Sequence, residues 1–153
     1  MDTKLLARYL EFRPAWPAFA VYIFGAALFL LGPMINPQAP IRPALSQLLG
    51  TCFVAFILLK RFTSLYRIEG GRIVAETSFP TRQIREAVIE EITRIDLRRG
   101  ITQRLMGVAH VHLYTGQGSD PAVKLFGVPR PDEFRRLLLE MGASDQRVTG
   151  AWR

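Results

Sequence analysis

Two long apolar runs constrain this chain more than any other feature of its sequence. Residues 15–35 and 43–59 contain no charged side chain, and the turn-rich "NPQAPIRP" separates them. At a rise of about 1.5 Å per residue, the first run can cross a hydrocarbon core of roughly 30 Å, and the second is slightly short of that length. Lys60 and Arg61 end the second run abruptly. The pattern predicts a two-helix transmembrane hairpin over residues 15–61.

The distribution of basic residues predicts the orientation of this hairpin. Three precede the first run, only Arg42 lies between the runs, and four follow the second within a short distance. Basic residues near span ends favour the cytoplasmic side, so both termini are expected in the cytoplasm. A cleaved signal sequence is the alternative for the first run. Its length, the poor cleavage site "PQA" and the second run that follows at once weigh against it.

Residues 1–14 form an N-terminal segment that two interpretations fit. Lys4, Arg8 and Glu11 share one helical face, and apolar side chains occupy the other. The segment is either an interfacial helix or a charged flank without fixed structure. Within the apolar runs, Ser46 and Gly50 form a small-xxx-small step, and Gly25 and Gly32 lie seven residues apart. These small residues predict close packing of the hairpin against itself.

From Ser64 onward the hydrophobic period changes to two, which indicates short strands. Gly70 and Gly71 predict a tight hairpin turn, and further strands are expected at 84–88, 92–98, 108–115 and 122–126. The segment "RPDEFRRLLLEMG" then predicts one helix with Phe134, Leu137, Leu138 and Met141 on a single stripe. Residues 62–142 are therefore expected to form a mainly-β cytoplasmic domain, a twisted antiparallel barrel or sandwich capped by a C-terminal helix. Residues 143–153 form a tail in which Trp152 can dock.

Three segments together resemble a known family. "YRIEGGRIVAET", "IDLRRGITQRLMGVAHVHLYTG" and "VKLFGVPRPDEFRRLLLE", placed after a membrane hairpin, resemble the bacterial pleckstrin-homology-like (PH-like) domains of the second type. The resemblance covers about 65–141 and implies a nearly closed antiparallel sheet plugged by the last helix. A PH fold has seven strands and six are found readily, so the seventh is missing, displaced or hidden around 79–82. The resemblance implies no shared activity, and it places the chain in a bacterial inner membrane.

Several function classes find no support in the sequence. The net charge of +7 is concentrated beside the apolar runs, which fits anionic lipid better than nucleic acid. The single cysteine, Cys52, excludes an internal disulfide and a thiolate zinc site. His110 and His112 share one strand face, which is expected to point outward without a metal, while Ala109, Val111 and Leu113 face the core. No phosphate loop or nucleophile elbow occurs, so a non-enzyme without a cofactor is expected.

The loop "RRGITQRLMG" is the strongest candidate for a contact site. Its arginines can meet phosphates or acidic side chains close to a negatively charged leaflet. Leu105 and Met106 can enter the membrane interface or the groove of a partner, or they can fold inward. For Leu105 the expectation is that it plugs the barrel, because the open end of a small barrel needs side chains. The candidate lipid-binding or partner-binding residues are Lys60, Arg61, Arg98, Arg99, Arg104 and Met106.

These observations predict a membrane-anchored PH-like scaffold that binds other membrane or cytoplasmic proteins. It can serve as a subunit or assembly factor of a membrane complex, and a homo-oligomer is compatible with the sequence. Two alternatives remain at this stage: a sensor of anionic lipid headgroups, and a purely structural subunit of a membrane enzyme or transporter.

Overall fold

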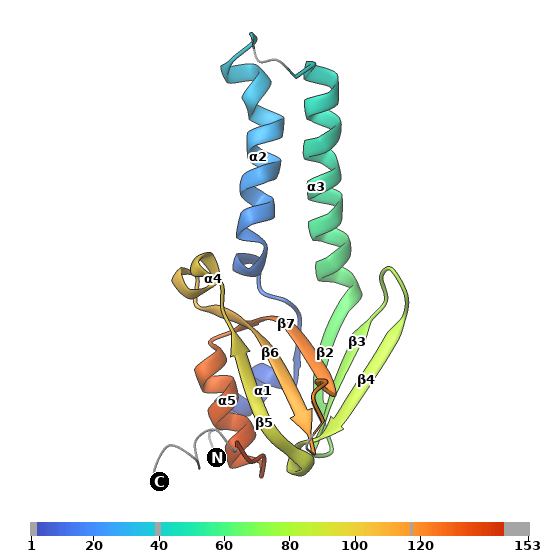
Figure 1. Ribbon diagram of the computed structural model, residues 1–153, viewed down its shortest axis with the longest axis vertical. Coiled ribbons are helices and arrows are strands. Elements are labelled where there is room, and N and C mark those ends of the chain that lie inside the picture. Colours follow the sequence, from blue (N-terminus) through green and yellow to red (C-terminus); the bar gives the residue numbers. More distant parts are fainter. Residues whose placement is uncertain (1–2, 39–40, 117, 146–153) are drawn as a thin grey trace.

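The computed structural model describes residues 3–38, 41–116 and 118–145, so the predicted docking of Trp152 lies outside the described residues. Two long helices stand side by side on a domain built from two antiparallel sheets and short helices (Figure 1). The long helices are α2 (Ala20–Ile35), which the 3-10 helix η1 (Trp16–Phe19) precedes, and α3 (Pro43–Thr63).

Within the described residues, the domain contains seven strands in sheets of four and three. The first sheet has the order β1 (Glu11–Phe12), β2 (Ser64–Glu69), β3 (Arg72–Thr77) and β4 (Gln83–Val88). The 3-10 helix η2 (Ile89–Glu91) leads into the second sheet, which has the order β5 (Ile92–Arg98), β6 (Val108–Thr115) and β7 (Val123–Pro129). Gly70 and Gly71 adopt φ of 55° and 74° in the β2–β3 turn, which confirms the predicted hairpin.

The seventh strand is displaced and is not hidden around residues 79–82. Residues 79–82 form the turn between β3 and β4, and the Phe79–Pro80 peptide is cis. The additional strand is β1, which precedes the first long helix and pairs Phe12 with Tyr66 of β2. A strand of two residues has too few positions to show an alternating pattern, so periodicity cannot reveal it.

The C-terminal helix α5 (Pro131–Glu140) caps the sheets as predicted. Phe134, Leu137 and Leu138 are fully buried in the main core together with side chains from both sheets. Arg130 precedes the helix with φ of 46°, and Pro131 occupies the first turn, where its missing N–H costs nothing. Helix α5 therefore supplies the apolar filling that closes the end of the domain.

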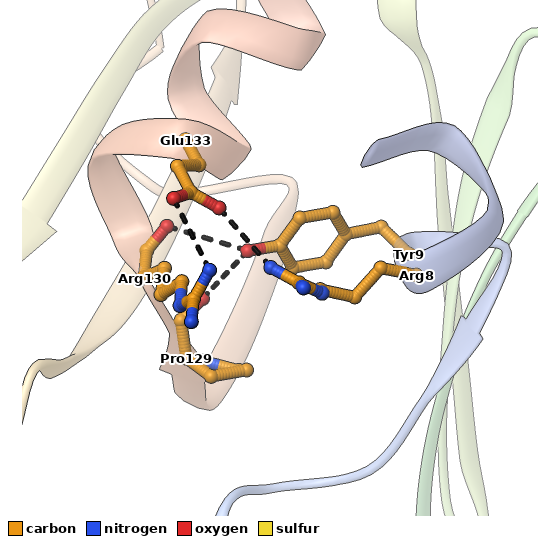
Figure 2. Close-up of polar contacts among 5 residues, drawn as sticks. All are labelled: Arg8, Tyr9, Pro129, Arg130 and Glu133. Atoms are coloured by element: carbon orange, nitrogen blue, oxygen red, sulfur yellow. Dashed lines mark hydrogen bonds and ion pairs between the residues drawn. The ribbon is translucent and has the colours of Figure 1, made fainter. Parts of the chain in front are cut away.

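The N-terminal helix α1 (Thr3–Tyr9) packs against α5 and belongs to the domain (Figure 2). Tyr9 is fully buried, and its hydroxyl donates a hydrogen bond to the Pro129 carbonyl at 2.8 Å. Burial, and next the nearby Glu133, raise the pKa of Tyr9 to about 12. Arg8 forms an ion pair with Glu133 at 3.3 Å. Residues 3–12 therefore join the domain that was expected to begin at residue 62.

The two long helices pack closely at their small residues. The Ser46 hydroxyl donates to the Phe29 carbonyl at 2.6 Å, and a Cβ on Gly50 would lie 2.6 Å from Cγ of Leu30. These contacts confirm the predicted role of Ser46 and Gly50. Gly25 faces the Phe53 ring, whereas Gly32 has open space around it, so Gly32 does not contribute to the packing.

Both ends of the helical pair join the domain without a flexible linker. Helix α3 ends at Thr63, and β2 begins at the next residue. At the other end, Ala15 donates its N–H to the Gly127 carbonyl at 2.9 Å. A Cβ on Gly127 would lie 2.5 Å from that of Ala18, so only glycine permits this approach of β7 to η1. The helical pair is thus inserted between β1 and β2 and braced on the domain.

Candidate functional site

The predicted contact loop forms a short helix, α4 (Ile101–Leu105), whose apolar side chains point away from the domain. Ile101 is 86% exposed, Leu105 is 82% exposed and Met106 is 52% exposed. The prediction that Leu105 plugs the barrel is therefore wrong. Phe134, Leu137 and Tyr9 already fill the core beside the sheets, so no space remains for Leu105.

Hydrogen bonds hold α4 in a defined position despite its exposure. Gly100 donates its N–H to Oε1 of Gln103 at 3.0 Å, and Arg104 donates its N–H to the Gly100 carbonyl at 2.9 Å. The Gln103 amide also lies 2.7 Å from Nε2 of His110 on β6. A small helix held by these hydrogen bonds is an ordered surface feature and not a flexible loop.

The three arginines of this region have different surroundings. Arg99 donates to Asp132 at 2.6 Å and so links the end of β5 to the first turn of α5. Arg98 and Arg104 are exposed, and neither forms an ion pair with a described residue. Among the arginines that the sequence singled out in this loop, these two are available for an external contact.

Lys60 and Arg61 lie at the foot of α3, in a separate place from α4. The Arg61 guanidinium donates to the Pro14 carbonyl and lies over the Trp16 ring, with 4.3 Å from Cζ to the ring centroid. It therefore braces the two long helices where they join the domain. Lys60 lines a cleft between the two sheets. The structure thus divides the six predicted residues between the region of α4 and the foot of α3.

Two apolar projections reach toward the same end of the domain. Along the long axis of the molecule, α4 lies at the level of the foot of α2, and the β3–β4 turn lies at the level of the foot of α3 (Figure 1). Phe79 at this turn is partly exposed. Sequence reasoning missed Ile101 and Phe79, although an apolar residue inside a polar turn was a visible signal for each.

The two histidines do not form the plain outer face that the sequence predicted. His110 is half-buried and stacks on Phe126 with ring centroids 4.4 Å apart. Gly127 donates its N–H to Nδ1 of His110 at 3.2 Å. Burial, and next the neighbouring His112, lower the pKa of His110, which keeps its ring neutral. Val108 on the same strand face is buried against Phe19 and Ile57 at the foot of the helical pair, and Tyr114 is buried with the Arg94 guanidinium 3.8 Å from its ring centroid.

Both ring nitrogens of His110 therefore hold neighbouring elements together. Burial also lowers the pKa of His112, with smaller effects from Arg98 and Lys124 in the same direction. Within residues 3–38, 41–116 and 118–145, no group of three or more metal-ligating side chains occurs. The predicted core residues Ala109, Val111 and Leu113 are fully buried, as expected.

Comparison with known proteins places this geometry in a family. A search of curated proteins and a search of solved structures each return no match. A family model described as "Bacterial PH domain" matches residues 18–142, which covers α2, α3 and the domain from β2 to the end of α5. That match, together with the sheets of four and three strands and the capping helix, confirms the resemblance seen in the sequence. The chain belongs to the bacterial PH domain family.

Proposed function

We propose that this chain is an integral protein of the bacterial inner membrane whose PH-type domain binds other proteins at the cytoplasmic leaflet. In this function it acts as a scaffold, or as a subunit or assembly factor of a membrane complex. The observation that carries the proposal is the insertion of the helical pair between β1 and β2 without a linker. A domain attached at two neighbouring strands presents its surfaces at a fixed distance and orientation from the bilayer.

The surface of the helical pair supports a membrane location. The helices Trp16–Ile35 and Pro43–Thr63 are long and apolar enough to span a bilayer, by length and composition. Their outward side chains are apolar and exposed, including Phe24 at 71%. A core helix of a soluble protein would bury such residues, whereas lipid covers them at no cost.

The position of β1 argues against a cleaved signal sequence. Cleavage after the first apolar helix would remove Tyr9 and Phe12, which pack in the main core. The strands that flank the helical pair are neighbours in one sheet, so both ends of the pair emerge on the side of the domain. With the excess of basic residues on that side, the proposal places both termini in the cytoplasm.

The proposal assigns no reaction to this domain. His110, a natural candidate for a general base, uses both ring nitrogens in contacts to Gly127 and Gln103. Cys52 lies on α3, within a proposed membrane span, and not beside a histidine. The arrangement around α4 offers contact surfaces instead of a nucleophile and base pair.

Recognition of anionic lipid headgroups is a second candidate function, and α4 favours it. Ile101 and Leu105 are the most exposed of the large apolar side chains on the described domain, and Arg98 and Arg104 flank them. Apolar tips with adjacent cations suit the interface of an anionic leaflet. In this alternative, α4 binds anionic lipid headgroups, and contact with proteins is secondary.

The decisive test is purification of the full chain from native membranes in a mild detergent, followed by mass spectrometry. The proposal expects one or a few proteins at stoichiometric ratio. A matched control carries the same helical pair on an unrelated soluble domain. Proteins retained equally by this control would assign the interaction to the helices, and the absence of any stoichiometric protein would contradict the proposal.

A further inference from the structure

A cleft between the two sheets, lined in part by the stacked rings of His110 and Phe126, is separate from the exposed apolar side chains of α4. Its volume is about 450 Å³, and side chains from both sheets, the β3–β4 turn and the foot of α3 line it. Strand β4 is the last strand of its sheet, and β7 is the last strand of the other. The cleft therefore opens where two unpaired strand edges diverge.

The charge around this cleft has one sign. Lys60 on α3, Arg85 on β4 and Lys124 on β7 all line it, and no aspartate or glutamate does. None of these three cations forms an ion pair with a described residue, whereas Arg72 and Arg82 nearby pair with Glu86 and Glu76. Three uncompensated cations around one concavity create a positive potential that attracts an anionic ligand.

The lining also includes an apolar floor. Phe79 and Pro80 of the turn and Leu125 and Phe126 of β7 contribute to it. His112 lines the cleft as well, and its buried Nδ1 has no hydrogen-bond partner among the described residues. Such a combination of apolar surface, cations and a spare polar group suits a ligand with alternating apolar and acidic groups.

The free edge of β4 supplies a third kind of contact. The β2–β3 turn has two residues, so Glu69 and Arg72 form a hydrogen-bonded pair. Hydrogen-bonded pairs alternate along an antiparallel strand, so the N–H and C=O groups of Gln83 and Arg85 point toward β3. The N–H and C=O groups of Ile84 and Glu86 point away from the sheet. These outward groups can accept an additional strand, and residues 83–86 are exposed on both faces.

We propose that this cleft binds an extended acidic segment of a partner protein, which lies along the edge of β4. Its carboxylates meet Lys60, Arg85 and Lys124, and its apolar side chains meet the floor at Phe79 and Phe126. The inference rests on the proposed interaction function and names the chemistry of the partner. A lipid headgroup would use the cations but neither the apolar floor nor the strand edge.

The test selects peptides from a displayed library of random dodecapeptides against the full chain in phosphatidylcholine nanodiscs. We expect peptides rich in Asp and Glu that alternate with apolar residues. In the variant Lys60→Gln/Arg85→Gln/Lys124→Gln, their affinity should fall by roughly tenfold or more, because each exposed charge pair contributes a small factor. The control variant Arg67→Gln/Arg72→Gln/Arg136→Gln loses the same net charge outside the cleft and should bind like the parent.

Thermal melting checks that both triple variants are folded. If the cleft triple variant is unfolded, the single variants Lys60→Gln, Arg85→Gln and Lys124→Gln replace it. Enrichment of no peptide, of basic peptides, or of peptides insensitive to the cleft substitutions overturns the proposal. Binding of soluble glycerophosphoglycerol that the cleft variant loses, without peptide binding, overturns it in favour of a headgroup site. If proteins from native membranes remain bound to the cleft variant, the cleft proposal fails while the interaction function stands.

Discussion

Helices α5 and α4 both carry leucines beside arginines, yet only α5 buries them. Leu137 and Leu138 of α5 are fully buried in the main core, whereas Leu105 of α4 is 82% exposed. At most two residues separate each helix from the strand before it, although α5 is twice as long as α4. The difference shows that a leucine beside an arginine is not by itself a sign of burial, because the packing of the whole domain decides which helix faces the core.

The physical reason lies in the filling of the domain. Burying a leucine side chain contributes about 1.5–3 kcal/mol, so both helices would gain by facing inward. Helix α5 is longer and places Phe134, Leu137 and Leu138 in the main core, and α1 adds Tyr9 beside them. Interiors are close-packed, so the remaining helix must find another apolar environment. For α4 that environment is lipid or a partner under the proposed function.

The largest expected effect comes from a charge placed on each helix in turn. Leu137→Asp should unfold the domain, because a carboxylate would be buried without a partner. Leu105→Asp should leave the fold intact, since the side chain is exposed. Circular dichroism and denaturant unfolding of the full chain in detergent measure both. Equal loss of structure in the two variants would contradict the comparison.

Removal of the Tyr9 side chain tests whether the N-terminal segment is part of the buried core, as α5 is. Tyr9→Ala should destabilise the domain by about 3–5 kcal/mol, as expected for the loss of a buried aromatic side chain. Tyr9→Phe keeps the ring and loses only the hydroxyl contacts to the Pro129 and Arg130 carbonyls, so its cost should be about 1 kcal/mol. A stable Tyr9→Ala variant would contradict the assignment of the Tyr9 side chain to the main core.

The exposure of α4 predicts a membrane contact that can be measured directly. In a Cys52→Ala background, Leu105→Cys labelled with an environment-sensitive fluorophore should report an apolar surrounding in phosphatidylglycerol nanodiscs. The same label at Arg136→Cys, on the exposed face of α5, should report water and serves as the control. Identical spectra at the two positions would place α4 in solvent and would contradict a lipid contact.

Arg98 and Arg104, which flank the apolar side chains of α4, should strengthen the membrane contact without stabilising the fold. Arg98→Gln/Arg104→Gln should change the free energy of unfolding by no more than about 0.5 kcal/mol, because both side chains are exposed. The variant should reduce the fluorophore shift at position 105 more at low salt than at high salt, since screening weakens surface charges. No change at any salt concentration would assign the contact to Ile101 and Leu105 alone.

The smallest expected effect is a pH dependence of the free energy of unfolding that originates at His110. Its pKa is lowered in the fold from the usual 6.5, mainly by burial. The unfolded chain therefore takes up the proton first, and stability is complete above about pH 6.5 and falls as the pH decreases below it. Denaturant unfolding across this range measures the slope, which His110→Gln should reduce. His112 adds to the slope, because its pKa is lowered as well.

Much of the architecture is already visible in local patterns. The two uncharged runs predicted the long helices, the alternation at 92–98 and 108–115 predicted β5 and β6 with the observed bounds, and the α5 stripe predicted the cap. These features depend on periodicity and on side-chain chemistry within one element, which neighbours in the sequence determine. The family resemblance rests on the same segments and is confirmed by the match over 18–142.

Only the tertiary structure decided the remaining features, because each depends on competition or contact between distant segments. Strand β1 is defined by its pairing with β2 across the whole helical pair. Leu105 is exposed because α5 and Tyr9 occupy the core, and Arg99 became a brace because Asp132 lies opposite. The cleft of Lys60, Arg85 and Lys124 exists only where two sheets diverge. Local sequence determined what each segment forms, and packing density determined which apolar and charged groups were left for binding.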